Sequence, residues 1–193
     1  MKNRMLRIIS GVFLSIFAVL VSYYGYALVS DGASWGIVTF YDLCYLFSGI
    51  FLLATGTFLI VGKPMISAIT MSIAVIFVIG IYYPQFITYL NDTEPYEDFY
   101  TAIPKFFALQ PVLSVLTAAL FAAVLWLKGK PSLIVAILSA VCGISALVLR
   151  FELFGYITGH PTVFNIFPAN VIVSVIFAGI YRFSENKTEQ TVS

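Results

Sequence analysis

Apolar residues run along this chain in six long blocks separated by short polar segments. The blocks cover about residues 6–28, 42–62, 65–86, 106–127, 132–152 and 163–182. Each approaches or exceeds the roughly 20 apolar residues that a helix needs to cross about 30 Å of hydrocarbon. The pattern predicts an all-α, polytopic integral membrane protein whose six transmembrane helices form one compact bundle.

Three boundaries need a closer look. Asp42 lies at the start of the second block, and Pro168 and Asn170 interrupt the first half of the sixth. The first block follows the basic segment "MKNRMLR", which resembles the start of a signal peptide. Its apolar run is longer than the usual 7–15 residues of a signal-peptide core, and no clean small-x-small cleavage site follows. We therefore expect the first helix to be retained.

The composition favours the same class of protein. The chain is 61% hydrophobic and only 10% charged, whereas a soluble domain is about 25% charged. No dense basic patch points to nucleic acid. The single histidine and two cysteines supply neither a zinc set nor paired haem ligands. We expect no cofactor and no resident metal.

The basic residues predict an orientation. Eight of the ten lie on one side of the predicted helices, which the positive-inside rule makes cytoplasmic. These eight are Lys2, Arg4, Arg7, Lys63, Lys128, Lys130, Arg182 and Lys187; Lys105 and Arg150 fall on the other side. Both termini then face the cytoplasm, and the location that fits is the cytoplasmic (inner) membrane of a bacterium.

The turns on the basic side are short and alike. "GKP" occurs at 62–64 and again at 129–131. Glycine suits the end of one helix and proline the first turn of the next. Such turns predict antiparallel neighbours, so that the single domain, 1–183, consists of three similarly oriented hairpins. The polar segment 184–193 is predicted to be a short, disordered cytoplasmic tail.

Charges near the opposite side fall at a membrane boundary. From Pro131 to Arg150 is about 28 Å at 1.5 Å per residue, which reaches the far edge of the hydrocarbon. Arg150 and Glu152 are two residues apart and cannot pair on a regular helix. We expect Arg150 to pair instead with Asp42 across the second and fifth helices. His160 follows at the outer surface.

Small and polar residues inside the helices predict how the helices pack. Helices in lipid associate through small side chains, because their contact brings no hydrophobic gain. Such residues recur four apart, as in Gly11 and Ser15 or Ser139 and Gly143. Asn170 is the deepest strongly polar side chain, so it must face another helix or a cavity. Gln110 is a second residue of this kind.

The outer side is acidic and aromatic. The loop between the third and fourth helices contains four acids, Asp92, Glu94, Glu97 and Asp98. They suit either a solvated loop or a site that captures a cation. Eleven of the twelve tyrosines, all but Tyr181, also lie in the outer half or outer loops. An aromatic belt explains their depth but not their one-sidedness.

The sequence carries no enzymatic signature and leaves three functions open. The first is a non-catalytic protein, such as a transport-associated subunit, that binds a small solute, a lipid or a partner helix from its outer face. The second is a membrane-embedded enzyme acting on lipid or an exported substrate, with Glu152, Asp42 or His160 as acid–base groups. The third is a partner-binding or immunity-type protein that acts through its outer loops. The residues expected to bind a ligand are Asn170, Gln110, Asp42, Arg150, Glu152 and His160.

Overall fold

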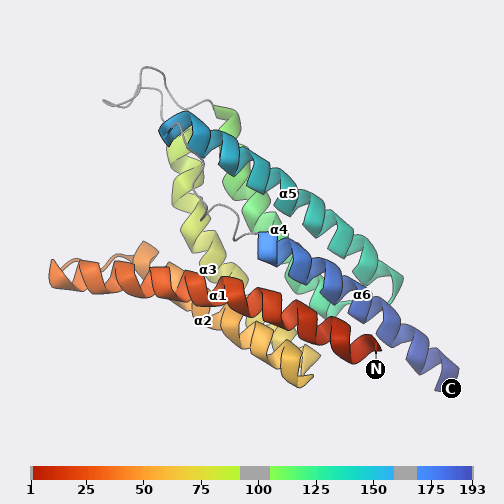
Figure 1. Cartoon of the computed structure of the whole chain (residues 1–193). Coiled ribbons are helices and arrows are strands. Elements are labelled where there is room, and N and C mark those ends of the chain that lie inside the picture. Colours follow the sequence, from red (N-terminus) through yellow and green to blue (C-terminus); the bar gives the residue numbers. More distant parts are fainter. Residues whose placement is uncertain (1, 92–104, 159–168, 193) are drawn as a thin grey trace.

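The computed structural model describes residues 2–91, 105–158 and 169–192, and in these ranges it is entirely helical (Figure 1). Its elements are α1 (Lys2–Ser34), α2 (Phe40–Val61), α3 (Pro64–Asn91), the 3₁₀ turn η1 (Lys105–Ala108), α4 (Leu109–Trp126), α5 (Lys130–Thr158) and α6 (Ala169–Val192). Five of these helices, α1 to α5, are long and apolar enough to cross a membrane. The chain is therefore an all-helical integral membrane protein.

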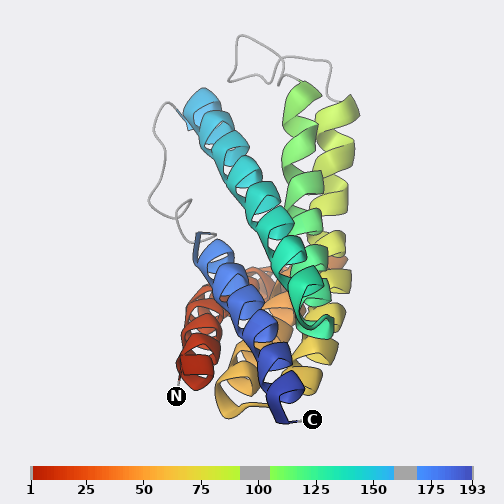
Figure 2. The same cartoon turned by 90° about the vertical axis from the view of Figure 1, so that its right-hand side faces the viewer.

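The helices follow one another around the bundle. Each packs against the next in sequence, and α1 also packs against α6, which closes the circuit. Both chain termini lie at one end, which we call the proximal end; the opposite end is distal (Figures 1 and 2). At the distal end, α1 and α2 point away from α4 and α5 (Figure 1).

Small residues bring α1 and α2 into very close contact. Ideal Cβ atoms placed on Gly11, Gly25, Gly49 and Gly56 would each lie within 2.6 Å of an atom of the other helix. Gly25 faces the backbone of Leu46, so the two helix backbones themselves touch at that point. This is the packing that small residues allow in lipid.

Small residues predicted to pack are buried in other helices too. Gly143 and Ser139 of α5, and Ser174 and Ala178 of α6, are among them. The core between the helices is otherwise apolar. Its fully buried large side chains include Leu14, Leu59, Met71, Phe121, Leu125 and Val175.

Buried serines link neighbouring helices. Ser10 of α1 and Ser174 of α6 exchange hydrogen bonds: each hydroxyl donates to the other residue's backbone carbonyl, at 2.9 and 2.8 Å. The Ser139 hydroxyl likewise donates to the carbonyl of Thr117 in α4, at 2.9 Å. A buried hydroxyl without a partner destabilises the fold, so these bonds favour one arrangement of the helices.

Three helices are longer at their distal ends than the hydrophobic blocks predict. α1, α3 and α5 end at residues 34, 91 and 158 rather than 28, 86 and 152, which adds six, five and six residues. Hydropathy marks where the chain leaves hydrocarbon, whereas a helix continues until something stops it. At 33 residues, α1 is about 50 Å long, well beyond the thickness of a bilayer core.

The remaining boundaries agree to within four residues, except in α6. Residues 163–168 of the predicted sixth span lie outside the described ranges, and α6 begins at Ala169. At its other end α6 continues to Val192, so most of the predicted disordered tail, 184–193, is helical instead. Glu, Lys and Gln in this segment are good helix formers, and Arg182 pairs with Glu185 one turn later.

Candidate functional site

The predicted pairing of Asp42 with Arg150 is wrong. Asp42 occupies the first turn of α2, where its carboxylate accepts a hydrogen bond from the backbone N–H of Thr39 at 2.9 Å. The Thr39 hydroxyl in turn accepts from the backbone N–H of Asp42, which completes a capping box. In the described ranges α2 and α5 share no extensive contact, and Arg150 lies half-buried on α5.

Gln110 is buried, as expected of a polar residue inside the bundle, but its own helix satisfies it. The side chain is only 4% exposed. Its amide donates to the hydroxyl of Ser114 at 3.1 Å, and that hydroxyl donates back to the Gln110 carbonyl at 3.0 Å. Gln110 therefore has a local structural role.

Asn170 lies half-buried in the first turn of α6, and it sits deeper than Gln110. Gly143 of α5 lies against both Thr117 of α4 and Ile172 of α6, which puts these two residues at similar depth. Gln110 is seven residues distal of Thr117, and Asn170 is two residues distal of Ile172. The two amides are thus offset by about 7 Å along the helices.

The other predicted site residues are not placed. Glu152 belongs to α5, but its side chain is not described. His160 and the loop acids Asp92, Glu94, Glu97 and Asp98 lie outside the described residues. The predicted set therefore does not come together as one site within the part of the chain that the structure describes.

A different polar group does come together, at the distal ends of α1, α2 and α3. We call it the distal tyrosine cluster: Tyr24, Tyr41, Tyr45 and Gln85. The Tyr41 hydroxyl donates to the Tyr45 hydroxyl at 3.2 Å, and the Gln85 amide donates to the Tyr41 hydroxyl at 3.2 Å. Tyr45 packs edge-on against both Tyr24 and Tyr41, with ring centroids 5.1 and 5.0 Å apart. Such edge-to-face pairs add stability beyond the area they bury.

The sequence held part of the signal for this cluster. Tyr41 and Tyr45 are four residues apart, so they stack on one face of α2. Gln85 is 44 residues from Tyr41, so its place in the cluster could be recognised only from the three-dimensional structure. The hydrogen bonds among Tyr41, Tyr45 and Gln85 and the ring contact of Tyr24 therefore join the distal ends of three helices.

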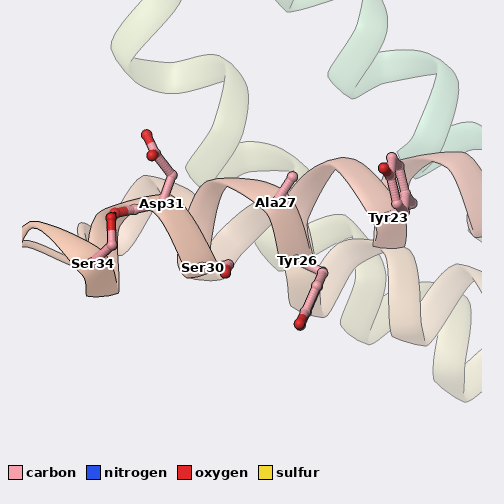
Figure 3. Close-up of a pocket in the computed structure, with 6 residues that line it drawn as sticks. All are labelled: Tyr23, Tyr26, Ala27, Ser30, Asp31 and Ser34. Carbon is pink, nitrogen blue, oxygen red and sulfur yellow. The ribbon is translucent and has the colours of Figure 1, made fainter.

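Next to this cluster, the distal half of α1 presents an open surface. Its residues Tyr23, Tyr26, Ala27, Ser30, Asp31 and Ser34 line a shallow hollow (Figure 3). We call this surface the α1 distal face. All six belong to one side of one helix, because their spacings of three and four residues match the helical repeat. Within the ranges that the structure describes, no other element lines this hollow, so it is a surface that another molecule can cover.

Large exposed side chains occur on the α1 distal face and after it along the chain. Tyr23 and Tyr26 of this face are 72% and 62% exposed; Trp35, just after α1, and Phe40, which begins α2, are 77% and 72% exposed. Aromatic residues of this kind dominate binding energy when they become buried at interfaces. The arrangement therefore suits the recognition of another surface.

Groups for covalent or metal chemistry do not gather in the described ranges. No three His, Cys, Asp or Glu residues there lie close enough to hold a metal ion. Cys44 and Cys142 are both free thiols. No family model, curated protein or solved structure matches the chain.

Proposed function

We propose that the protein crosses the membrane six times, with its proximal end in the cytoplasm and its distal end outside. The gathering of basic side chains at the proximal end supports this orientation, because Arg7, Lys63, Lys130 and Arg182 all lie there. The sixth crossing combines the described start of α6 with the apolar residues that precede it. The membrane that suits this orientation is the bacterial cytoplasmic membrane.

We further propose that the protein is a non-catalytic membrane component that binds a partner membrane protein on its outer side. The α1 distal face is the observation that carries this proposal. Small residues, Ala27, Ser30 and Ser34, allow a partner helix to approach closely, and Tyr23 and Tyr26 provide aromatic contact area beside them.

The neighbours of α1 explain why this face is open. α1 and α6 meet at Ser10 and Ser174, and α6 begins only five residues distal of Ser174, at Ala169. In the described ranges the distal half of α1 therefore has α2 as its main neighbour. The distal tyrosine cluster holds α1 and α2 together there, so a partner meets a surface that is already ordered. Preorganisation of this kind lowers the entropic cost of binding.

This surface favours a partner over the other ligands that the sequence left open. A small solute needs a concave site that buries most of its surface, whereas the α1 distal face is lined from one side only. An enzyme needs acid and base groups in mutual reach, and Asp42 is already engaged in capping α2.

Site-specific photo-crosslinking in intact cells tests the proposal. A benzophenone amino acid replaces Tyr26 in one variant and Tyr83 of α3 in a matched control. Both tyrosines are 62% exposed, so the two probes differ in helix and not in accessibility. We expect a discrete protein adduct from position 26 and lipid adducts alone from position 83.

A third variant tests whether the face itself is responsible. Ser30→Trp places a bulky side chain on the same face one turn beyond Tyr26 (Figure 3), and it should remove the adduct at position 26 while the protein remains at its normal level in the membrane. Lipid adducts alone at position 26, or one protein captured equally at both positions, would contradict the proposal.

A further inference from the structure

The two Gly-Lys-Pro turns at the proximal end share a glycine with positive φ. Gly62 follows α2 with φ of 91°, and Gly129 precedes α5 with φ of 72°. Both angles lie in the left-handed region, where glycine carries no steric penalty. Each glycine is followed by an exposed lysine, Lys63 or Lys130, and then by a proline.

An arginine from the first helix holds the first turn. The guanidinium of Arg7 lies directly against Gly62, and its Nη2 donates to the carbonyl of Ile60, at the end of α2, over 3.4 Å. The carbonyl end of a helix carries a partial negative charge, which a cation stabilises.

An arginine from the last helix holds the second turn in the same way. Arg182 is only 5% exposed, and its Nε donates to the carbonyl of Leu127, just after α4, at 2.9 Å. The backbone N–H of Gly129 donates to the Arg182 carbonyl at 3.1 Å, and Glu185 pairs with the guanidinium.

The two turns lie at the same end of the bundle (Figure 2), and we call the cations gathered at that end the basic surface. α1 and α6 are neighbours, and Tyr181 lies within electrostatic reach of both Arg7 and Arg182. The side chains described at this end include six cations, which are Arg4, Arg7, Lys63, Lys128, Lys130 and Arg182. Against them stands one described acid, Glu185, so the balance is 6 − 1 = +5.

Apolar surface adjoins this charge on the side that meets lipid. Val61 and Met65 flank Lys63 and are 63% and 68% exposed. Ile134, one turn after Lys130, is 58% exposed. A ligand that binds here therefore needs a negative group at the end of the helices and hydrocarbon along their sides.

We propose that this basic surface binds the headgroup phosphates of anionic phospholipids, with Lys63 as the principal contact at the first turn and Lys130 at the second. The half-buried Arg7 and the buried Arg182 shape the two turns, and the exposed lysines face outward for the lipid. The acyl chains lie along the apolar surface beside them. This site is independent of the α1 distal face and of any partner that binds there.

Fluorescence quenching by brominated lipid provides the test. Trp126 ends α4 and is 51% exposed, which makes it a reporter at the proximal end. The full chain, carrying Trp35→Phe so that Trp126 is the single tryptophan, is reconstituted in nanodiscs with brominated phosphatidylglycerol or brominated phosphatidylcholine. We expect phosphatidylglycerol to quench at a several-fold lower mole fraction than phosphatidylcholine.

The preference should disappear in the double variant Lys63→Gln, Lys130→Gln and persist in Lys105→Gln, which removes one charge outside the proximal end. A basic residue near an anionic surface strengthens binding by about fivefold, so loss of both lysines should weaken it by up to about thirtyfold. Circular dichroism of the double variant checks that its helix content is unchanged.

Two results would overturn the assignment. One is equal quenching by the two lipids in the chain that keeps both lysines. The other is an equal preference for phosphatidylglycerol in the double variant. Inorganic phosphate added to phosphatidylcholine nanodiscs is a second probe, which distinguishes a lipid ligand from a soluble anion. Thermal unfolding of the protein is followed by Trp126 fluorescence. If phosphate raises the unfolding temperature as much as phosphatidylglycerol does, the site belongs to a free anion instead.

Discussion

The close approach of α1 and α2 can be tested by adding one methyl group. In Gly25→Ala, the new Cβ would lie 2.3 Å from the backbone nitrogen of Leu46 and 2.7 Å from the carbonyl carbon of Tyr45. Ordinary contact begins near 3.4 Å, so the helices must separate by about 1 Å. Neither neighbour can turn aside, because both atoms belong to the backbone.

The expected loss of stability follows from that displacement. Overpacking in a well-packed interior destabilises by about 1–3 kcal/mol. A gap of 0.5–1 Å removes roughly a quarter to a half of each dispersion contact along the interface. The higher helix propensity of alanine does not compensate, since the helices persist in lipid after they separate. We expect Gly25→Ala to lower the free energy of unfolding by about 2 kcal/mol.

Gly143→Ala is the matched control. It also adds one methyl group to a buried helix interface, but its nearest contacts are side-chain atoms of Ile172 and Thr117 at 3.0 and 3.2 Å. These can move by a few tenths of an ångström, so the change should be below about 0.5 kcal/mol. Unfolding by SDS in mixed micelles, followed by tryptophan fluorescence, measures both variants. Wild-type stability in Gly25→Ala, or equal losses in both, would refute the packing argument.

Three further predictions concern single contacts, each checked by the same unfolding measurement. In a double-mutant cycle of Ser10→Ala and Ser174→Ala, we expect a coupling of about 0.5–1.5 kcal/mol, as for interhelical hydrogen bonds in lipid; additive losses would contradict it. Gly62→Ala should lower the free energy of unfolding more than Gly36→Ala, because both glycines have positive φ but only a Cβ on the first also collides with a side chain, that of Arg7. Equal losses of stability would mean that the Arg7 side chain moves aside at no cost. Thr39→Ala removes the side-chain cap of α2 and should cost about 1 kcal/mol, and an unchanged midpoint would show that the cap is dispensable.

Local patterns in the sequence predicted the helices and turns well. The period and length of the apolar blocks placed five membrane-crossing helices, and the repeated Gly-Lys-Pro placed two turns that the structure confirms at 62–64 and 129–131. Hydropathy did not predict the distal extensions of α1, α3 and α5. It indicates which residues lie in hydrocarbon, and it does not indicate where a helix ends outside it.

The predicted ion pair between Asp42 and Arg150 failed because it relied on depth alone. Asp42 and Arg150 fall at similar depth, yet α2 and α5 are not neighbours in the described ranges, and the local Thr39 cap engages Asp42. Both the cap and the bond between Gln110 and Ser114 join residues three or four apart, so they were legible in the sequence.

Long-range partners were out of reach of sequence reasoning. Ser10 and Ser174 are 164 residues apart, and Tyr41 and Gln85 are 44 apart. No periodicity pairs them, because their meeting depends on which helices become neighbours. The distal tyrosine cluster emerged only when the order of helices around the bundle was known, whereas the gathering of basic residues on one side was already predicted from the sequence.

The orientation of the bundle is the premise on which both proposed surfaces depend, and cysteine accessibility in intact cells measures it directly. With Cys44 and Cys142 replaced by serine, single cysteines are introduced at Lys63, Lys130 and Asp31 and treated with a membrane-impermeant maleimide. The account predicts labelling at position 31 in intact cells, and at positions 63 and 130 only after the membrane is opened. Labelling of 63 or 130 from the medium, or protection of 31, would contradict it.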